Sequence, residues 1–142
     1  MKNYTQEEIH SLIERFENCI LPKIEWTHEA HLVVAIWYCS NYQFEEALKL
    51  VRKNITAHNE SVGTPNTDHE GYHETITKFW LLTALRFISE CDKLPVSDLC
   101  NHFINSKFSS SNYPLNFYSE ALLFSVNARH NWVEPDRMAL SI

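Results

Sequence analysis

The stretch Thr27-His-Glu-Ala-His-Leu-Val-Val-Ala-Ile-Trp-Tyr-Cys39 decides the fold. The hydroxyl of Thr27 is suited to cap the N-terminus of a helix. Residues 32–39 are apolar on every side of such a helix rather than along one stripe. A helix that is apolar all round is buried. We therefore expect a central helix that starts after Thr27 and around which the other segments pack.

The neighbouring segments have the periodicity of amphipathic helices. Thr5-Gln-Glu-Glu8 is a capping-box pattern, and the apolar spacing after it predicts a helix that ends at Leu21-Pro22. A third helix is expected after the turn at Asn41-Tyr42, with its charged side facing solvent. Further helices are predicted over about 72–90, 97–105 and 119–130, followed by an irregular C-terminal tail.

Length and composition agree with one helical domain. The chain has 142 residues, 44% of them hydrophobic, which is enough to form a core without disulfides or metals. Only two glycines occur, so a turn-rich β fold is disfavoured. We predict an all-α, single-domain bundle of five to six helices over residues 1–142.

Charge and cysteine content narrow the class of protein. The formal charge of −6 is the wrong sign for a nucleic-acid-binding protein. The N-terminus has no apolar signal core, and no segment approaches the ~18 apolar residues that span a membrane, so a cytoplasmic protein is expected. The four cysteines are widely spaced, and we expect them to be reduced thiols, mostly buried.

Histidines are concentrated in two segments. His28 and His31 are three residues apart on the central helix, and His69 and His73 precede another helix, with acidic residues interleaved. If the first four helices alternate in direction, the starts of the second and fourth lie at the same end of the bundle. The third helix would bring His58 there as well. The sequence therefore predicts a polar, histidine-rich pocket around the loop that precedes Gly71.

Neutral imidazoles with one or two carboxylates are typical ligands of zinc, iron and manganese, and helical bundles commonly build such sites. One hypothesis is therefore a small metal-dependent enzyme acting on a small-molecule substrate. His28, His31, His69 and His73 are the candidate metal ligands. Glu74 and His31 are the candidate catalytic residues, with Glu74 as a ligand or general base.

Three other interpretations stay open. Helix N-termini are electropositive, so the same pocket could hold a carboxylate or phosphate while His31 or His73 transfers a proton. The apolar tail could instead mediate a homodimer, with the histidines incidental. Finally, the histidines could be structural: His28 could order the start of its helix, and His73 could bind a backbone carbonyl.

Two stretches carry a resemblance, Glu25-Trp-Thr-His-Glu-Ala-His-Leu32 and Pro65-Asn-Thr-Asp-His-Glu-Gly-Tyr-His-Glu-Thr75. The chain resembles a group of small, functionally uncharacterised bacterial proteins that have Trp-Thr-His-x-x-His-Leu, an Asn-Thr loop and Gly-Tyr-His-Glu-Thr. The similarity extends to Trp132-Val-Glu-Pro-Asp136. The resemblance implies a site shared between these segments, without a mechanism.

Overall fold

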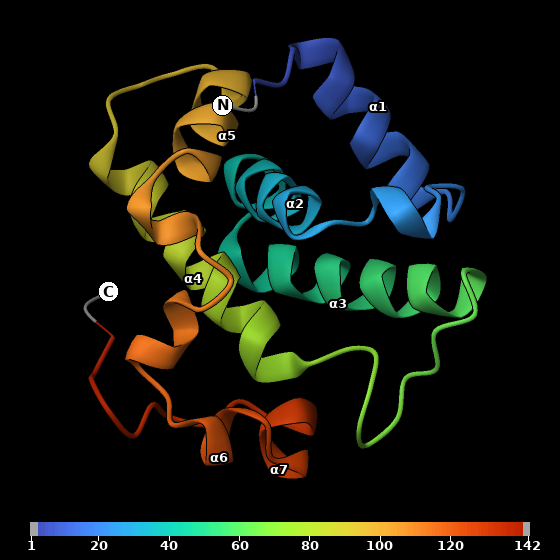
Figure 1. Cartoon of the computed structure of the whole chain (residues 1–142). Helices are drawn as coiled ribbons and strands as arrows, with labels where there is room; N and C mark the ends of the chain where they lie inside the picture. The colour runs from blue at the N-terminus through green and yellow to red at the C-terminus, as the bar shows by residue number, and fades with distance from the viewer. Residues whose placement is uncertain (1–2, 141–142) are drawn as a thin grey trace.

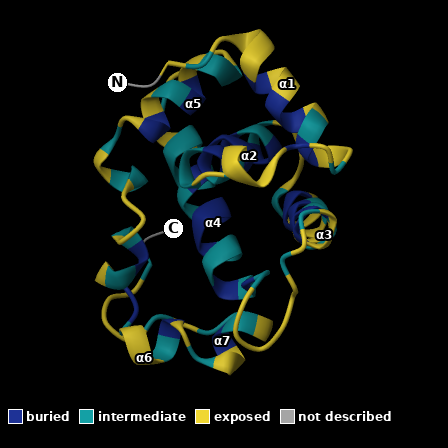
Figure 2. Cartoon of the chain, turned by 45° about the vertical axis from the view of Figure 1, so that its right-hand side comes forward, coloured by how far each residue is buried: buried dark blue, intermediate teal, exposed yellow. Residues whose placement is uncertain are grey.

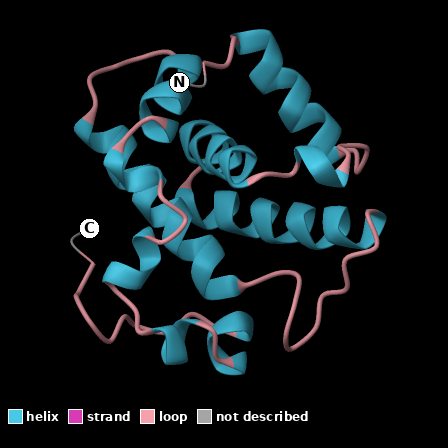
Figure 3. Ribbon diagram, viewed as in Figure 1, coloured by secondary structure: helices cyan, strands magenta, loops and turns pink. Residues whose placement is uncertain are grey.

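The computed structural model describes residues 3–140, which fold into seven α-helices joined by loops (Figures 1 and 3). No strand occurs in this range, so the predicted all-α class is confirmed. Within the same residues, no helix is both long and apolar enough to cross a membrane. The helices are α1 Gln6–Glu17, α2 His28–Asn41, α3 Phe44–Ser61, α4 Glu74–Glu90, α5 Val96–Ile104, α6 Glu120–Leu123 and α7 Val126–His130.

Helix α2 is the centre of the molecule, as its sequence predicts. It packs against α1, α3, α4 and α5, and its residues Leu32, Val33 and Ile36 are fully buried. Figure 1 looks nearly along α2 while α3 lies across the view, so these helices cross instead of running antiparallel. The simple alternation of directions assumed from the sequence is therefore wrong. A helix that is apolar on every side accepts neighbours from all around, so nothing in its sequence favours one packing direction.

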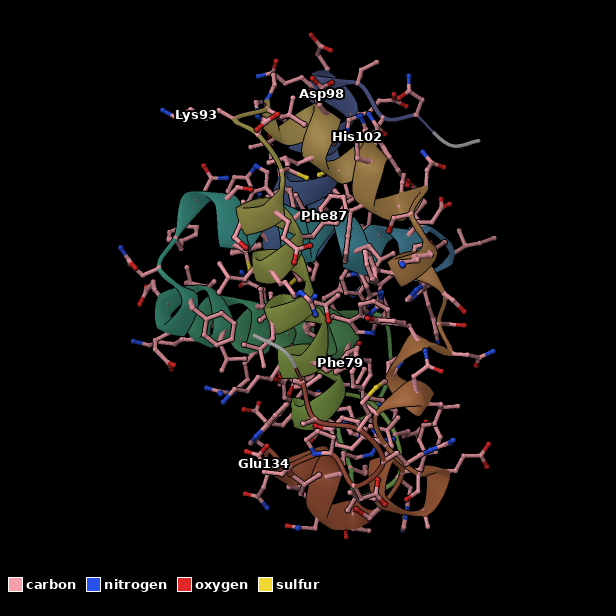
Figure 4. All side chains as sticks on the ribbon, turned by 90° about the vertical axis from the view of Figure 1, so that its left-hand side faces the viewer. Phe79, Phe87, Lys93, Asp98, His102 and Glu134 are labelled. Carbon is pink, nitrogen blue, oxygen red and sulfur yellow. The ribbon has the colours of Figure 1, made fainter. Side chains whose placement is uncertain are left out.

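The C-terminal third packs on α4 and α5. Phe79 and Phe87 of α4 (Figure 4) contact Phe117 of the tail and Phe103 of α5, with ring centroids 5.4 and 5.1 Å apart. The helix predicted over 119–130 is divided into α6 and α7. Ser125 lies between them, and its hydroxyl accepts a hydrogen bond from the backbone of Ala128, which starts a new helix.

Helix α1 starts as predicted but ends earlier. The capping box of Thr5 and Glu8 is present in both directions. The helix ends at Glu17 rather than at Leu21-Pro22 because Cys19 has a left-handed φ of 59°. The N–H of Ile20 then donates to the carbonyl of Arg15 at 2.9 Å, which closes a Schellman-type end. Glycine is the usual residue at such a position. Because residue 19 is a cysteine, the sequence does not indicate that the helix ends here.

We expect Cys19→Gly to raise the free energy of unfolding by about 0.5–1 kcal/mol. Glycine adopts a positive φ without the steric cost that a Cβ incurs, and this gain exceeds its larger chain entropy. Urea denaturation followed by circular dichroism measures the change. Cys91→Gly is the matched control, because Cys91 follows α4 with φ at −92° and should not gain stability. A less stable Cys19→Gly protein would contradict this account of the helix end.

Candidate functional site

Hydrogen bonds of the Asn66 side chain fix the loop between α3 and α4. The Oδ1 of Asn66 accepts hydrogen bonds from the side chain of Asn59 at 3.0 Å and from the backbone of Tyr72 at 2.9 Å. Its Nδ2 donates to the carbonyl of Thr56 at 3.2 Å. Gly71 follows with φ at +84°, and a Cβ there would lie 2.4 Å from the carbonyl oxygen of Pro65. Although most of this loop is exposed (Figure 2), these contacts hold the start of α4 beside the end of α3.

His73 is a structural residue in this fold. It is 7% exposed and is the N-cap of α4, with its Nδ1 accepting a hydrogen bond from the N–H of Ile76 at 3.1 Å. Its Nε2 donates to the carbonyl of Leu123, 2.7 Å away, at the end of α6. Burial lowers the pKa of His73. Both ring nitrogens are thus occupied by the protein, which matches the structural interpretation of this residue.

The carboxylate of Glu74 is also engaged by the protein. Arg52 of α3 donates to its two oxygens at 2.9 and 2.8 Å, and the hydroxyl of Tyr72 donates at 2.6 Å. Burial raises the pKa of Glu74, but the hydrogen bonds from Arg52 and Tyr72 hold it below the usual value. The carboxylate therefore stays ionised and joins α3 to α4, and its predicted role as general base or metal ligand stays a prediction.

His28 and His69 are not among the residues that line the cleft described below. The Nε2 of His28 donates to the carbonyl of Ser109 at 2.7 Å, and its ring contacts the edge of Trp80. His69 is exposed in the loop, where the neighbouring Asp68 contacts His130 at 2.7 Å. Among residues 3–140, no group of three or more His, Cys, Asp or Glu side chains is arranged to hold a metal ion. Of the five histidines that the sequence predicts to meet, His31 and His73 line the cleft described next, and His58 contacts its wall.

A cleft of about 470 Å³ lies where the two histidine-bearing segments do meet. The turn before α2, the first turn of α2, the end of α3, the start of α4 and α7 all contribute to it. It brings together His31 and His73, as the sequence predicts, but not His28, His69 or Glu74. The lining residues are Lys23, Trp26, His31, Ile55, Asn59, Val62, Thr64, Gly71, Tyr72, His73, Ile76, Thr77, Phe124 and Arg129.

His31 is the imidazole of the cleft with a nitrogen left for a ligand. Its Nδ1 lies 2.7 Å from the carbonyl of Thr27. A carbonyl only accepts, so Nδ1 carries the hydrogen and Nε2 keeps its lone pair. Burial lowers the pKa of His31 to about 4, so the ring is neutral at pH 7. Because Nε2 is not protonated at pH 7, it can accept a hydrogen bond from a ligand in the cleft.

Trp26 forms a fixed wall of the cleft. The indole of Trp26 stacks on the ring of His31, with ring centroids 3.7 Å apart. It also stacks on the ring of Phe16, with centroids 4.7 Å apart. The buried ring of His58 contacts the indole at 5.3 Å and donates from Nε2 to the carbonyl of Leu21. His58 thus belongs to the support behind the cleft, and the paired stacking holds the indole in one orientation.

Two cations that no sequence pattern marks as site residues also line the cleft. Lys23 lies on the exposed turn before α2. Arg129 of α7 donates from Nη1 to the carbonyls of Gly71 at 2.9 Å and Tyr72 at 3.4 Å, which orients its guanidinium toward the start of α4. A guanidinium has five N–H donors, so further donors remain on its other nitrogens. Among the described lining residues, none is aspartate or glutamate.

We expect the burial of neutral His31 to make the protein less stable in acid. The lowered pKa means that the unfolded chain binds the proton more readily, so stability is lost as pH falls below about 6.5, the usual value, toward 4. The loss from this residue between pH 7 and pH 5 is about 1–2 kcal/mol. Urea denaturation at a series of pH values should show a shallower slope for His31→Phe, which keeps a ring against Trp26. Equal slopes in the wild type and in His31→Phe would contradict the assignment.

Comparison of the chain with protein-family models, with curated proteins and with solved structures finds no match. The resemblance to the group of small bacterial proteins therefore stays a prediction. The residues of its motifs have distinct structural tasks here: Asn66 and Gly71 shape the loop, and Thr27 and His73 cap helices. Of these two segments, Trp26, His31, Gly71, Tyr72 and His73 line the cleft.

Proposed function

We propose that the cleft binds a small anionic ligand, without a metal. The observation that carries this proposal is a local reversal of charge. The whole chain has 18 acidic and 12 basic residues, yet the described lining of the cleft has Lys23 and Arg129 and no carboxylate. Two cations in one concave site attract an anion, and arginine offers paired donors to carboxylate or phosphate.

Other features of the cleft support the same ligand class. Helices α2 and α4 both begin there, and their positive ends favour a negative charge. The Nε2 of His31 supplies an acceptor for a hydroxyl or amide on the ligand, and Trp26 adds an apolar part of the wall. A volume of about 470 Å³ is in the range of small-molecule sites.

The metal-dependent alternative has less support from the same geometry. A metal site would need the ring nitrogens of His73 or the oxygens of Glu74. The nitrogens of His73 are hydrogen-bonded to Leu123 and Ile76, and the carboxylate of Glu74 is hydrogen-bonded to Arg52. The dimer alternative rests on the tail, where Phe117 and Tyr118 are buried within the fold while Phe124 and Met138 are exposed. Neither alternative uses Lys23 or Arg129.

Isothermal titration calorimetry with sodium acetate and inorganic phosphate tests the proposal. We expect saturable binding with a Kd on the order of 1–10 mM for acetate, within the ceiling of about 1.5 kcal/mol per non-hydrogen atom for very small ligands. Lys23→Gln should weaken binding about threefold, a modest factor because this lysine is exposed and screened by solvent.

The matched control is Lys49→Gln, an equally exposed lysine on α3 that is outside the cleft lining. It removes the same charge from the molecule and should leave the Kd unchanged. Absence of saturable binding by the wild-type protein, or equal weakening in both variants, would show that the cleft is not the anion site.

A further inference from the structure

A small, mainly apolar chamber adjoins the cleft. Its volume is about 50 Å³, and it shares Trp26, His31, Ile55, Ile76 and Thr77 with the cleft lining. The remaining walls are apolar and come from three helices: Val34 and Ala35 of α2, Val51 of α3, and Trp80 and Leu81 of α4. The cationic cleft and this chamber are therefore neighbouring spaces, and both are lined by Trp26 and His31.

The two spaces differ in the chemistry that they can hold. The cleft has Lys23 and Arg129, whereas the chamber has no charged side chain among its described lining residues. An apolar space of this kind is filled favourably by hydrocarbon, whose transfer from water is the driving force. A single molecule that occupies both spaces must have a charged end and an apolar end.

The volume sets the length of the apolar end. A cavity of about 150 Å³ lined by apolar side chains holds the six carbons of benzene. In proportion, a chamber of about 50 Å³ holds about two carbons. Longer chains would have to turn back into the cleft or displace walls that are close-packed.

We propose that the ligand is a short-chain aliphatic anion, with its carboxylate or equivalent group near Lys23 and Arg129 and an apolar end of about two carbons in the chamber. This inference rests on the proposed function and adds the chemical class of the ligand. His31 lines both spaces, so in a ligand that spans them its ring would lie beside the first carbons after the charged group. A hydroxyl substituent at that place would find an acceptor there.

A series of straight-chain carboxylates tests the length preference. The sodium salts of formate, acetate, propionate, butyrate, valerate and hexanoate are titrated into the protein by calorimetry at constant ionic strength. We expect the affinity to rise about fourfold for each carbon that enters the chamber, and to stop rising at propionate or butyrate. A rise that continues unchanged through hexanoate would overturn the inference.

Variants of the chamber walls provide the control. Ala35→Val fills the chamber and should abolish the gain from acetate to butyrate. Val51→Ala enlarges it and should move the plateau one or two carbons further along the series. Val33→Ala makes the same truncation at a buried position outside the chamber and should keep the wild-type plateau. Circular dichroism confirms that each variant is folded, and the two wall variants give independent readings if one of them is not.

Failure of the inference and failure of the proposed function have different signatures. Binding of every carboxylate with the same affinity, still weakened by Lys23→Gln, leaves the anion site standing and overturns the length preference. No binding of any carboxylate or of phosphate overturns both. A plateau that is unchanged in Ala35→Val and Val51→Ala also overturns the chamber as the place of the apolar end.

Discussion

Gly71→Ala lowers the free energy of unfolding by about 3 kcal/mol, the largest effect that we expect from a single methyl group in this chain. Gly71 has φ at +84°, where an L residue costs about 1–2 kcal/mol. The added Cβ would also lie 2.4 Å from the carbonyl oxygen of Pro65 and 2.8 Å from the Cα of Asn66. Both contacts are with backbone, so the loop must shift, which costs a further 1–3 kcal/mol by analogy with overpacking. Urea denaturation measures the total.

Gly63→Ala separates the two contributions. Gly63 also has a positive φ, +80°, but nothing lies within 4 Å of the position that its Cβ would take. We expect this variant to lose about 1 kcal/mol, which is the conformational cost alone. Equal losses in the two variants would mean that the close approach of Gly71 to the loop backbone is not a determinant of stability.

The second large effect is expected at His73. His73→Ala removes the N-cap of α4 and leaves the carbonyl of Leu123 without its donor in a buried place. Loss of a cap costs about 1 kcal/mol, and an unsatisfied buried group costs about 1–3 kcal/mol. The free energy of unfolding should therefore fall by about 2–4 kcal/mol, as measured by urea denaturation.

Two further variants show whether this loss has the proposed cause. His73→Asn keeps a good N-cap and should recover about 1 kcal/mol relative to His73→Ala. His69→Ala changes an exposed histidine of the same motif and should stay within about 0.5 kcal/mol of the wild type. If His73→Ala were as stable as the wild type, the histidine would not be the structural residue described here.

Much of the fold can be predicted from local patterns. The all-round apolar run of α2 predicts its central place, and the capping box predicts the start of α1. What escapes prediction depends on single backbone conformations and on packing direction. Cys19 ends α1 in a left-handed conformation that a cysteine rarely adopts and that its residue type does not predict. Helix α3 crosses α2 at an angle that apolar residues alone do not specify.

The candidate site is predicted only in part, because ring nitrogens and charges find their partners through tertiary contacts. His31 and His73 share one cleft although α2 and α3 cross, so the alternating order of helices assumed from the sequence is not what brings them together. The occupation of both nitrogens of His73 requires Leu123, which lies 50 residues away in the sequence. Arg129 contacts the carbonyl of Gly71 across 58 residues from a helix of five residues, so no local pattern marks it.

The most direct test of the anion site is nuclear magnetic resonance of the ¹⁵N-labelled protein while sodium acetate is added at constant ionic strength. We predict saturable shifts of the indole N–H of Trp26 and the amide of Gly71, two residues of the cleft wall. Replacing both Lys23 and Arg129 by glutamine should remove the saturation. Saturable shifts confined to residues outside the cleft, or shifts at Trp26 that survive the double replacement, would contradict the proposal.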